Sequence, residues 1–593
     1  MLCAVGLGML TALYISMAPH TVQGLDAGEL VAGAYNRTVV HPPGYPLWVW
    51  LMHAATHAVD YGTVFLRASL LNIAFATLVL SCLTLAGRYK IAAFIASCCL
   101  ALQQTFFTYA VVPDVFMLNG LLFAALCVVY DRWAIGHERT LLLAVLFGLG
   151  LANHQTFIAT APMVLQGIFA QRRWRAGVGA LAVGLGLCAV LYASLMLMQP
   201  RDPRSWGNLQ TGADWLRHVL RQEYGTWRLA RTAAPVRPWL HWAYMLRLGF
   251  GALPMAMLLG CVTPALMLLR AAYRKLMPHR LWWLWASLSL YVLLFFVGVN
   301  QTDERVIERF LLMPLIGYSY LAVALYSRLR LPHNRGINAL MCSAALLSCA
   351  HHVAQDSAAR DLSKNTIVED YAQNLLRMAQ LHPPTVLIVD GDTPLGALRY
   401  VQHVQHINAH VPVVALTGPA AWQLEHLRQT HPDLVVSNAV GHGLHTSDLM
   451  SRFIEPNEPA YSFLCNTTKG LDVSHQQVVY MGLGRRLQMG MGRGVDTESV
   501  KAIVLRSTPA HLKPTAHIRE DKVLFASYAT ADFVAGKFSR DSALKKAHFT
   551  HALSLVPYCW PAAYELCLLE DAAEDAHCRE HFDAQRAQDA RYF

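Results

Sequence analysis

The chain has 593 residues, of which 55% are hydrophobic and only 15% are charged. Soluble domains carry charged residues at about a quarter of their positions, so this composition excludes a purely soluble protein and indicates a membrane protein. The formal net charge of +10 does not indicate nucleic-acid binding, because the basic residues gather in short loops between apolar segments, as orientation signals do.

Apolar segments recur along the chain up to about residue 355 and then stop. Most of them are long enough to cross about 30 Å of hydrocarbon. We expect crossings at about 1–18, 64–86, 91–111, 115–130, 176–198, 244–269, 281–299, 310–327 and 337–355. The first segment lacks a charged leader and a small-residue cleavage site, so it is predicted to be a retained helix rather than a signal peptide.

Two apolar stretches do not fit a simple crossing. The stretch 46–59 is short and is predicted to be interfacial or re-entrant, and 141–170 is predicted to be a hairpin broken at Ala152–Thr156. The positive-inside rule then assigns the basic clusters at 87–90, 131–139, 171–175, 270–280 and 327–335 to the cytoplasm. The polar loops and everything after residue 355 consequently fall on the extracytoplasmic side.

The first outer loop reads GLDAGELVAGAYNRTVVHPPGYPLW, from Gly24 to Trp48. Asp26 and Glu29 are three residues apart, so on a helix they share one face. A carboxylate near hydrocarbon costs about 2.5–3.5 kcal/mol on insertion scales, which favours a functional role over a solvated helix start. Such a carboxylate could take a proton from a hydroxyl or hold a divalent ion. In HPPGYP the prolines restrict the backbone, so that His41 and Tyr45 are held in place; a plain helix-entry turn is the alternative.

Further polar residues stand at membrane boundaries. Asn153 and His154 lie at the predicted break, where they could either form interhelical hydrogen bonds or line a cavity for a lipid headgroup. Glu308 and Arg309 directly precede a crossing, and an arginine at that depth is suited to binding phosphate with two hydrogen bonds. Alternatively, the arginine could pair with Glu308 or extend its side chain to the membrane interface. This alternative is favoured for Arg305.

The long outer loop, 199–243, contains apolar residues at helical spacing. They predict an amphipathic helix that lies on the membrane and covers a lipid-linked substrate. Its apolar residues are Trp215, Leu216, Val219 and Leu220, and its other faces carry Arg217, His218 and Arg221.

The chain after residue 355 has ordinary soluble composition. Residues 383–416 read as strand, turn, helix and strand, which predicts an α/β layer. Asp390 and Asp392 follow the first strand and could bind a metal or a ligand, although a loop and helix-cap role is favoured. Residues 542–566 resemble one tetratricopeptide-type helical repeat. We therefore predict a multi-pass membrane domain at 1–355, a soluble extracytoplasmic α/β domain at 356–540 and a C-terminal helical segment at 541–593.

Five segments together resemble the domain-of-unknown-function 2723 family, which includes the transmembrane protein 260 proteins. They are DAGELVAGAYNRTVVHPPGYPLW, PDVFMLN, GLGLANHQT, WGNLQTGADWLRHVLRQEYGT and ERFLLMPL. The resemblance spans most of residues 20–330 and implies a GT-C type membrane glycosyltransferase related to the protein O-mannosyltransferases. Such an enzyme would move a sugar, mannose by family analogy, from a polyprenyl-phosphate carrier to a protein Ser/Thr or glycan hydroxyl. The compact loops fit a bacterial inner membrane.

The resemblance also implies roles for single residues. Asp26 matches the catalytic carboxylate of GT-C enzymes, with Glu29 beside it, whereas Asp114 replaces the family's usual glutamate and is given no catalytic role. The residues expected to bind donor or acceptor are His41, Tyr45, Asn153, His154, Trp206, Arg221, Tyr224, Glu308 and Arg309. A divalent metal could take part, with ligands left open. A transporter or flippase of lipid-linked substrates is the alternative function, and a membrane anchor for a binding domain is a third.

Overall fold

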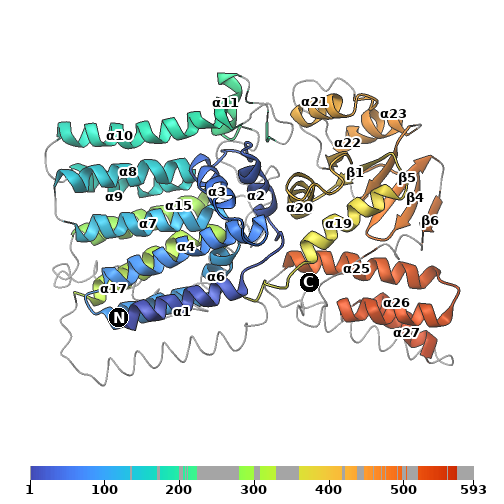
Figure 1. The fold of residues 1–593 in the computed structure, drawn as a ribbon, viewed down its shortest axis with the longest axis horizontal. Coiled ribbons are helices and arrows are strands. Elements are labelled where there is room, and N and C mark those ends of the chain that lie inside the picture. The colour runs from blue at the N-terminus through green and yellow to red at the C-terminus, as the bar shows by residue number, and fades with distance from the viewer. Residues whose placement is uncertain are drawn as a thin grey trace. The chain divides into compact units, whose positions relative to one another are not determined.

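The structure is a computed structural model, and it divides the chain into two compact units (Figure 1). The membrane unit comprises Met1–His20 and Gly33–Ser363, and the C-terminal unit comprises Thr21–Ala32 and Lys364–Phe593. The structure describes residues 2–133, 136–169, 174–198, 205–207, 209, 211–222, 279–298, 308–328, 360–416, 421–436, 446–458, 460–468, 471–474, 476–489, 492–496, 503, 519–556 and 559–570.

The described part of the membrane unit is helical. Its elements are α1 (Leu2–Met17), α3 (Pro46–Ala58), α4 (Val64–Ala86), α5 (Lys90–Ala101), α6 (Gln104–Val111), α7 (Val115–Arg132), α8 (His137–Asn153), η1 (Gln155–Thr160), α9 (Ala161–Phe169), α10 (Trp174–Ala193), η2 (Ser194–Leu197), α11 (Gly212–Val219), α15 (His279–Gly298) and α17 (Leu312–Tyr326). Helix α2 (Ala27–Asn36) begins in the C-terminal unit and ends in the membrane unit.

Four of the described helices are long and apolar enough to span a bilayer: Val64–Ala86, Val115–Arg132, Trp174–Leu197 and Glu308–Tyr326. They coincide with the crossings predicted at 64–86, 115–130, 176–198 and 310–327, and the protein is an integral membrane protein with several candidate spans. The crossing predicted at 281–299 falls on α15, and those at 244–269 and 337–355 lie outside the described residues.

The crossing predicted at 91–111 falls on a bent pair of helices, so it stays a prediction. The segment 91–111 forms α5 and α6, which meet at an angle of 76°. The side chain of Gln103 accepts a hydrogen bond of 2.7 Å from the backbone N–H of Phe106, so it caps the start of a second helix inside the apolar run. The predicted break at Ala152–Thr156 is confirmed, since α8 ends at Asn153, and the short stretch 46–59 forms the 13-residue helix α3.

Helices α8 and α10 run side by side (Figure 1) and approach closely through glycines. A Cβ atom added to Gly184 would overlap the backbone carbonyl of Ala144, whereas one added to Gly186 on the same helix would meet nothing. Small residues let membrane helices pack backbone to backbone.

We therefore expect Gly184→Ala to push α8 and α10 apart and to lower stability by about 1–3 kcal/mol, the usual cost of overpacking. Thermal unfolding in detergent checks this, with Gly186→Ala as the matched control. Equal melting temperatures for the two variants would contradict the close contact.

The C-terminal unit contains a six-stranded mixed sheet. Its elements are α19 (Ile367–Gln380), β1 (Thr385–Val389), α20 (Asp392–His403), β2 (Val413–Ala415), α21 (Ala421–Thr430), α22 (Thr446–Leu449), η5 (Met450–Ile454), α23 (Glu455–Asn457), β3 (Ser462–Cys465), β4 (Gln476–Met481), β5 (Gly484–Met489), β6 (Gly492–Asp496), α25 (Arg519–Phe538), α26 (Ser542–Leu555) and α27 (Trp560–Glu570). The strand order is β2-β1-β3-β5-β4-β6. Strand β1 is parallel to β2 and β3, and β5 is antiparallel to its neighbours β3 and β4.

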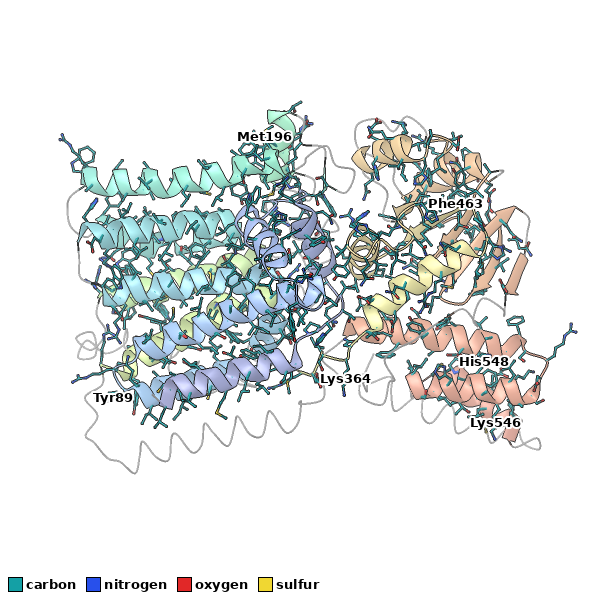
Figure 2. The ribbon with its side chains drawn as sticks, viewed as in Figure 1. Tyr89, Met196, Lys364, Phe463, Lys546 and His548 are labelled. Atoms are coloured by element: carbon teal, nitrogen blue, oxygen red, sulfur yellow. The ribbon has the colours of Figure 1, made fainter. Side chains whose placement is uncertain are left out.

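The burial of the central strands explains why the sequence predicts them as continuous apolar runs. All five residues of β1 are buried, as expected for a central parallel strand, and Phe463 of β3 (Figure 2) is fully buried beside them. The predicted strand–turn–helix–strand order over 383–416 is confirmed as β1, α20 and β2. Asp392 is the first residue of α20, and the backbone N–H of Asp390 donates to Asn466 at 2.9 Å.

The last described helices form a separate layer. Asp541 caps α26, and Asp532 of α25 accepts hydrogen bonds from Nδ1 of His548 (2.9 Å; Figure 2) and of His551 (2.6 Å). The hydrogen bond with Asp532 raises the pKa of His551. Cys567 of α27 is disulfide-bonded. Helices α26 and α27 lie where the helical repeat was predicted, and the tetratricopeptide likeness stays a prediction.

Candidate active site

The segment HPPGYP forms a tight turn before α3. The N–H of Gly44 donates to the carbonyl of His41 at 2.9 Å, and Tyr45, at φ 41° and ψ 53°, takes the left-handed conformation that starts the helix at Pro46. The turn brings His41 Nε2 to 3.1 Å from the Tyr45 hydroxyl, so the two side chains share a hydrogen bond. Their rings meet edge to face at 5.2 Å. The proline-containing turn thus holds the His41 and Tyr45 side chains in contact.

The His154 ring lies among aromatic rings in the membrane unit. It is extended at φ −154°, which ends α8, and its Nδ1 accepts a 3.2 Å hydrogen bond from the N–H of Thr156, which starts η1. Tyr45 stacks on the His154 ring with centroids 5.6 Å apart and planes 14° apart. Phe116 and Phe310 approach the same ring at 4.9 and 5.8 Å. The helix break therefore places the predicted site residue His154 among aromatic rings.

The neighbours of His154 hold the break in place. Asn153 is fully buried, and its Nδ2 donates to the carbonyl of Val115 at 3.0 Å. Gln155 Nε2 donates to the carbonyl of Val219 at 2.6 Å. The sequence left two roles open for Asn153, an interhelical hydrogen bond or the lining of a headgroup cavity. The structure shows the interhelical hydrogen bond.

Arg309 lies against the same aromatic group. Its guanidinium carbon is 5.5 Å from the Phe116 ring centre and 5.9 Å from that of Phe310, and its Nη1 is 3.8 Å from Oδ2 of Asp114. The Asp114 side chain is buried, at 4% exposure, and the Arg309 side chain is partly buried, at 13% exposure. Sequence reasoning gave Asp114 no role, although an acidic residue at the start of a crossing was a usable signal. Glu308, also predicted, accepts a backbone hydrogen bond from Leu311 at 2.9 Å.

The loop that follows α10 contacts the HPPGYP turn. The N–H of Trp206 donates to the carbonyl of Val39 at 2.7 Å, which brings the indole to 6.0 Å from the His41 ring. Arg221 follows the end of α11, and its N–H donates to the carbonyl of His218 at 3.0 Å. Tyr224 lies outside the described residues. Of the three predicted residues of this loop, Trp206 and Arg221 are therefore described by the structure. Trp206 contacts His41.

The prediction for α11 is corrected at one residue. His218 was assigned to a polar face, yet it is only 6% exposed, whereas Leu216 is 48% exposed. The reason is that the Trp215 indole donates to the carbonyl of Tyr192 at 2.9 Å and so turns its face of the helix inward. His218, three residues later, lies on that same face.

His218 makes the attachment of α11 pH-dependent. Burial lowers the pKa of His218 to about 3, with the charge of His41 acting in the same direction. An opened α11 would restore the ordinary histidine pKa of about 6.5. The attached form therefore has its full stability above about pH 6.5 and loses up to about 1.4 kcal/mol per pH unit as the pH falls below that value.

Hydrogen exchange of residues 211–222, corrected for intrinsic rates, should accordingly show more opening at pH 5 than at pH 7.5. His218→Asn should remove this pH dependence, and His57→Asn, at an exposed histidine of α3, should preserve it. Identical opening at both pH values in the native chain would contradict a buried neutral His218.

Asp26 and Glu29 belong to the C-terminal unit. Asp26 directly precedes α2, and its carbonyl accepts a hydrogen bond of 2.9 Å from the N–H of Leu30. Glu29 is 9% exposed, and its Oε1 lies 3.8 Å from Nη1 of Arg399. No cluster of three or more His, Cys, Asp or Glu side chains within the described ranges is arranged to hold a metal ion.

Residues 26–177 match the family model described as "Protein O-mannosyl-transferase TMEM260 N-terminal domain". Residues 26–177 are therefore similar to the N-terminal domain of the TMEM260 proteins. Mouse (Mus musculus) "Protein O-mannosyl-transferase TMEM260" is 25% identical over 496 residues, which cover 77% of this chain and 69% of the mouse protein. The Dictyostelium discoideum protein "Protein O-mannosyl-transferase tmem260" is 26% identical over 248 residues, which cover 37% of this chain and 30% of that protein. The protein is thus a distant homologue of these transferases.

A solved structure shows the fold. The crystal structure of ArnT from Cupriavidus metallidurans bound to undecaprenyl phosphate matches with a TM-score of 0.51 at 11% sequence identity, over 82% of this chain and 96% of that chain. The protein therefore has an ArnT-like GT-C fold with a mixed sheet region. The matched residues 26–177 include Asp26, Glu29, His41, Tyr45, Asn153 and His154, whereas Trp206 and Arg309 lie beyond them.

Proposed function

We propose that this protein is a membrane glycosyltransferase that moves a sugar from a polyprenyl-phosphate donor to a hydroxyl of an exported protein or glycan. Mannose is the family-based choice of sugar, and a protein Ser or Thr is the family-based acceptor. The observation that carries the proposal is the partly buried guanidinium of Arg309, which lies over Phe116 and Phe310, the two phenylalanines that also contact the His154 ring. A cation with apolar walls suits a phosphate that is attached to an apolar chain.

The reaction can be written with these residues. The acceptor hydroxyl oxygen attacks the anomeric carbon of the donor, the bond from that carbon to the phosphate oxygen breaks, and the hydroxyl proton passes to the Asp26 carboxylate. Polyprenyl phosphate leaves, and Arg309 stabilises its developing negative charge. The rings of His41 and Trp206, which are only partly buried, offer flat surfaces on which a sugar can stack, whereas Tyr45 is buried against His154.

The position of the site along the helices supports an outer location. Arg328 pairs with Asp131 at 2.6 Å, and Arg280 and Arg139 donate to the carbonyls of Asp131 and Tyr130. This basic group lies at the end of α7, whereas Asp114 and Val115 lie at its start. By the positive-inside rule the basic end is cytoplasmic, so the Arg309 site would be extracytoplasmic.

The C-terminal unit fits the same side. The disulfide at Cys567 is a feature of proteins in oxidising compartments. We place this unit outside the cytoplasm, as a bacterial inner-membrane arrangement would have it, with the tetratricopeptide-like helices as candidates for acceptor binding.

The experiment uses the detergent-purified full chain reconstituted in vesicles with polyprenyl-phosphate-mannose, with and without a chelator, because Asp26 could also hold a divalent ion. A transferase releases polyprenyl phosphate and forms a new glycoside. A transporter or flippase would instead move the intact donor to the other leaflet. Movement of intact donor without any release of polyprenyl phosphate would replace the proposal by that alternative.

A further inference from the structure

We propose that α20 of the C-terminal unit holds the acidic segment 21–32 in its working conformation, with Thr393, Gly396 and Arg399 as positioning residues. This inference rests on the proposed function, because it assigns a task to these residues through Asp26 and Glu29. Its starting point is that 21–32 forms one compact unit with residues 364–593.

The first contact joins two backbones. A Cβ atom added to Gly28 would lie 2.6 Å from the carbonyl carbon and oxygen of Gly396, and one added to Gly396 would lie 3.3 Å from the backbone nitrogen of Glu29. Distances under 3.0 Å to backbone atoms cannot be relieved by a side-chain movement, so glycine at position 28 permits the approach of α2 to α20. The start of α2 therefore rests directly on α20.

The second contact fixes a strained residue. Leu25 has φ 58°, in the left-handed region that a leucine rarely adopts. Its backbone N–H donates to the Thr393 hydroxyl at 2.9 Å. Such a conformation persists only where the surroundings hold it, and strained residues of this kind cluster at functional sites. Leu25 directly precedes Asp26. We therefore infer that this hydrogen bond fixes the backbone conformation from which the Asp26 side chain projects.

Polar contacts extend along the rest of the segment. Asn365 Nδ2 donates to Gln23 Oε1 at 3.0 Å, and the Asn365 carbonyl accepts from the Thr21 hydroxyl at 2.5 Å. On the other side of Asp26, Nη1 of Arg399 lies 3.8 Å from Oε1 of Glu29. These contacts lie before and after Asp26 in the chain. The C-terminal unit therefore carries a positioning surface for the proposed base, beyond any role in acceptor binding.

Thr393→Val tests the hydrogen bond to Leu25 at nearly constant side-chain volume, and Arg399→Leu tests the ion pair. We expect amide exchange across 21–32 to quicken about tenfold or more in both, and kcat to fall about ten- to a hundredfold with donor KM nearly unchanged. Arg399→Lys should restore part of kcat, which a merely structural loss would not give. The matched controls are Thr430→Val and Arg452→Leu, both at exposed positions of the same unit.

The two arms of the test separate the two claims. Exchange across 21–32 reports the holding contact whether or not the protein is a transferase, and turnover reports its use. Unchanged exchange in both variants, or quickened exchange with native kcat, would overturn the inference while leaving the proposed function standing. Full turnover by Asp26→Asn would exclude Asp26 as the base and leave the exchange result standing, whereas absence of sugar transfer in the native chain would remove the proposed function. On the Asp26→Asn background, Thr393→Val should cause no further loss, because both act on one step.

Discussion

Replacing Asp26 with asparagine should lower sugar transfer from a polyprenyl-phosphate donor by about 10²–10⁴-fold, the usual contribution of a positioned general base. Asparagine keeps the size of the side chain and its place before α2, but it cannot accept the hydroxyl proton. Donor binding should change little, because the residues proposed to bind phosphate lie elsewhere in the chain. The measurement is the initial rate of transfer at saturating donor, together with donor KM.

Asp60→Asn is the matched control for this substitution. Asp60 lies between α3 and α4 with its side chain 97% exposed, and it forms an ion pair with Arg67. Its replacement removes one exposed carboxylate at little cost to the fold, so turnover should stay at the native level. Equal rates for Asp26→Asn and the native chain would exclude Asp26 as the base.

Arg309→Leu should lower kcat by about 10²–10³-fold, the loss found when one donor to a developing anion is removed. Arg309→Lys should fall between the native chain and Arg309→Leu, because lysine keeps the charge but loses the planar pair of donors. The leucine variant should also be less stable, since breaking a buried ion pair costs about 3–5 kcal/mol. Asp114→Asn in the same chain should recover part of that stability without restoring turnover.

Arg328→Leu separates the catalytic effect from the stability effect. Arg328 also pairs with a buried carboxylate, that of Asp131, but at the other end of α7. The two leucine variants should therefore lose comparable stability, and only Arg309→Leu should lose turnover. If Arg328→Leu lost as much turnover as Arg309→Leu for the same loss of stability, Arg309 would act through the fold alone.

Much of the architecture was predictable because it depends on local patterns. The strand β1 reads as a continuous apolar run since it is buried throughout, and the break after Asn153 was visible as polar residues within an apolar stretch. The bend between α5 and α6 was not predicted. Three polar residues, Gln103, Gln104 and Thr105, divide the apolar run, and the average hydropathy of the whole segment gives them little weight.

The candidate site was predictable residue by residue but not as a set of contacts. His41, Tyr45 and His154 were each recognised from local motifs, whereas the approach of Arg309 to Asp114 joins segments far apart in the chain. The same limit applies to His218, whose burial depends on the hydrogen bond from Trp215 to Tyr192. Likewise, no local pattern indicated that residues 21–32 form one compact unit with 364–593.

The most direct measurement of the central claim is the fate of the sugar. The purified native chain in vesicles is supplied with isotopically labelled polyprenyl-phosphate-mannose and Ser/Thr-containing acceptor peptides, and the products are analysed by mass spectrometry. We predict one labelled hexose on a peptide hydroxyl for each polyprenyl phosphate released, with Arg309→Leu forming about a hundredth as much or less. Recovery of all label in intact donor, across a panel of sugars, peptides and glycan acceptors, would contradict the account.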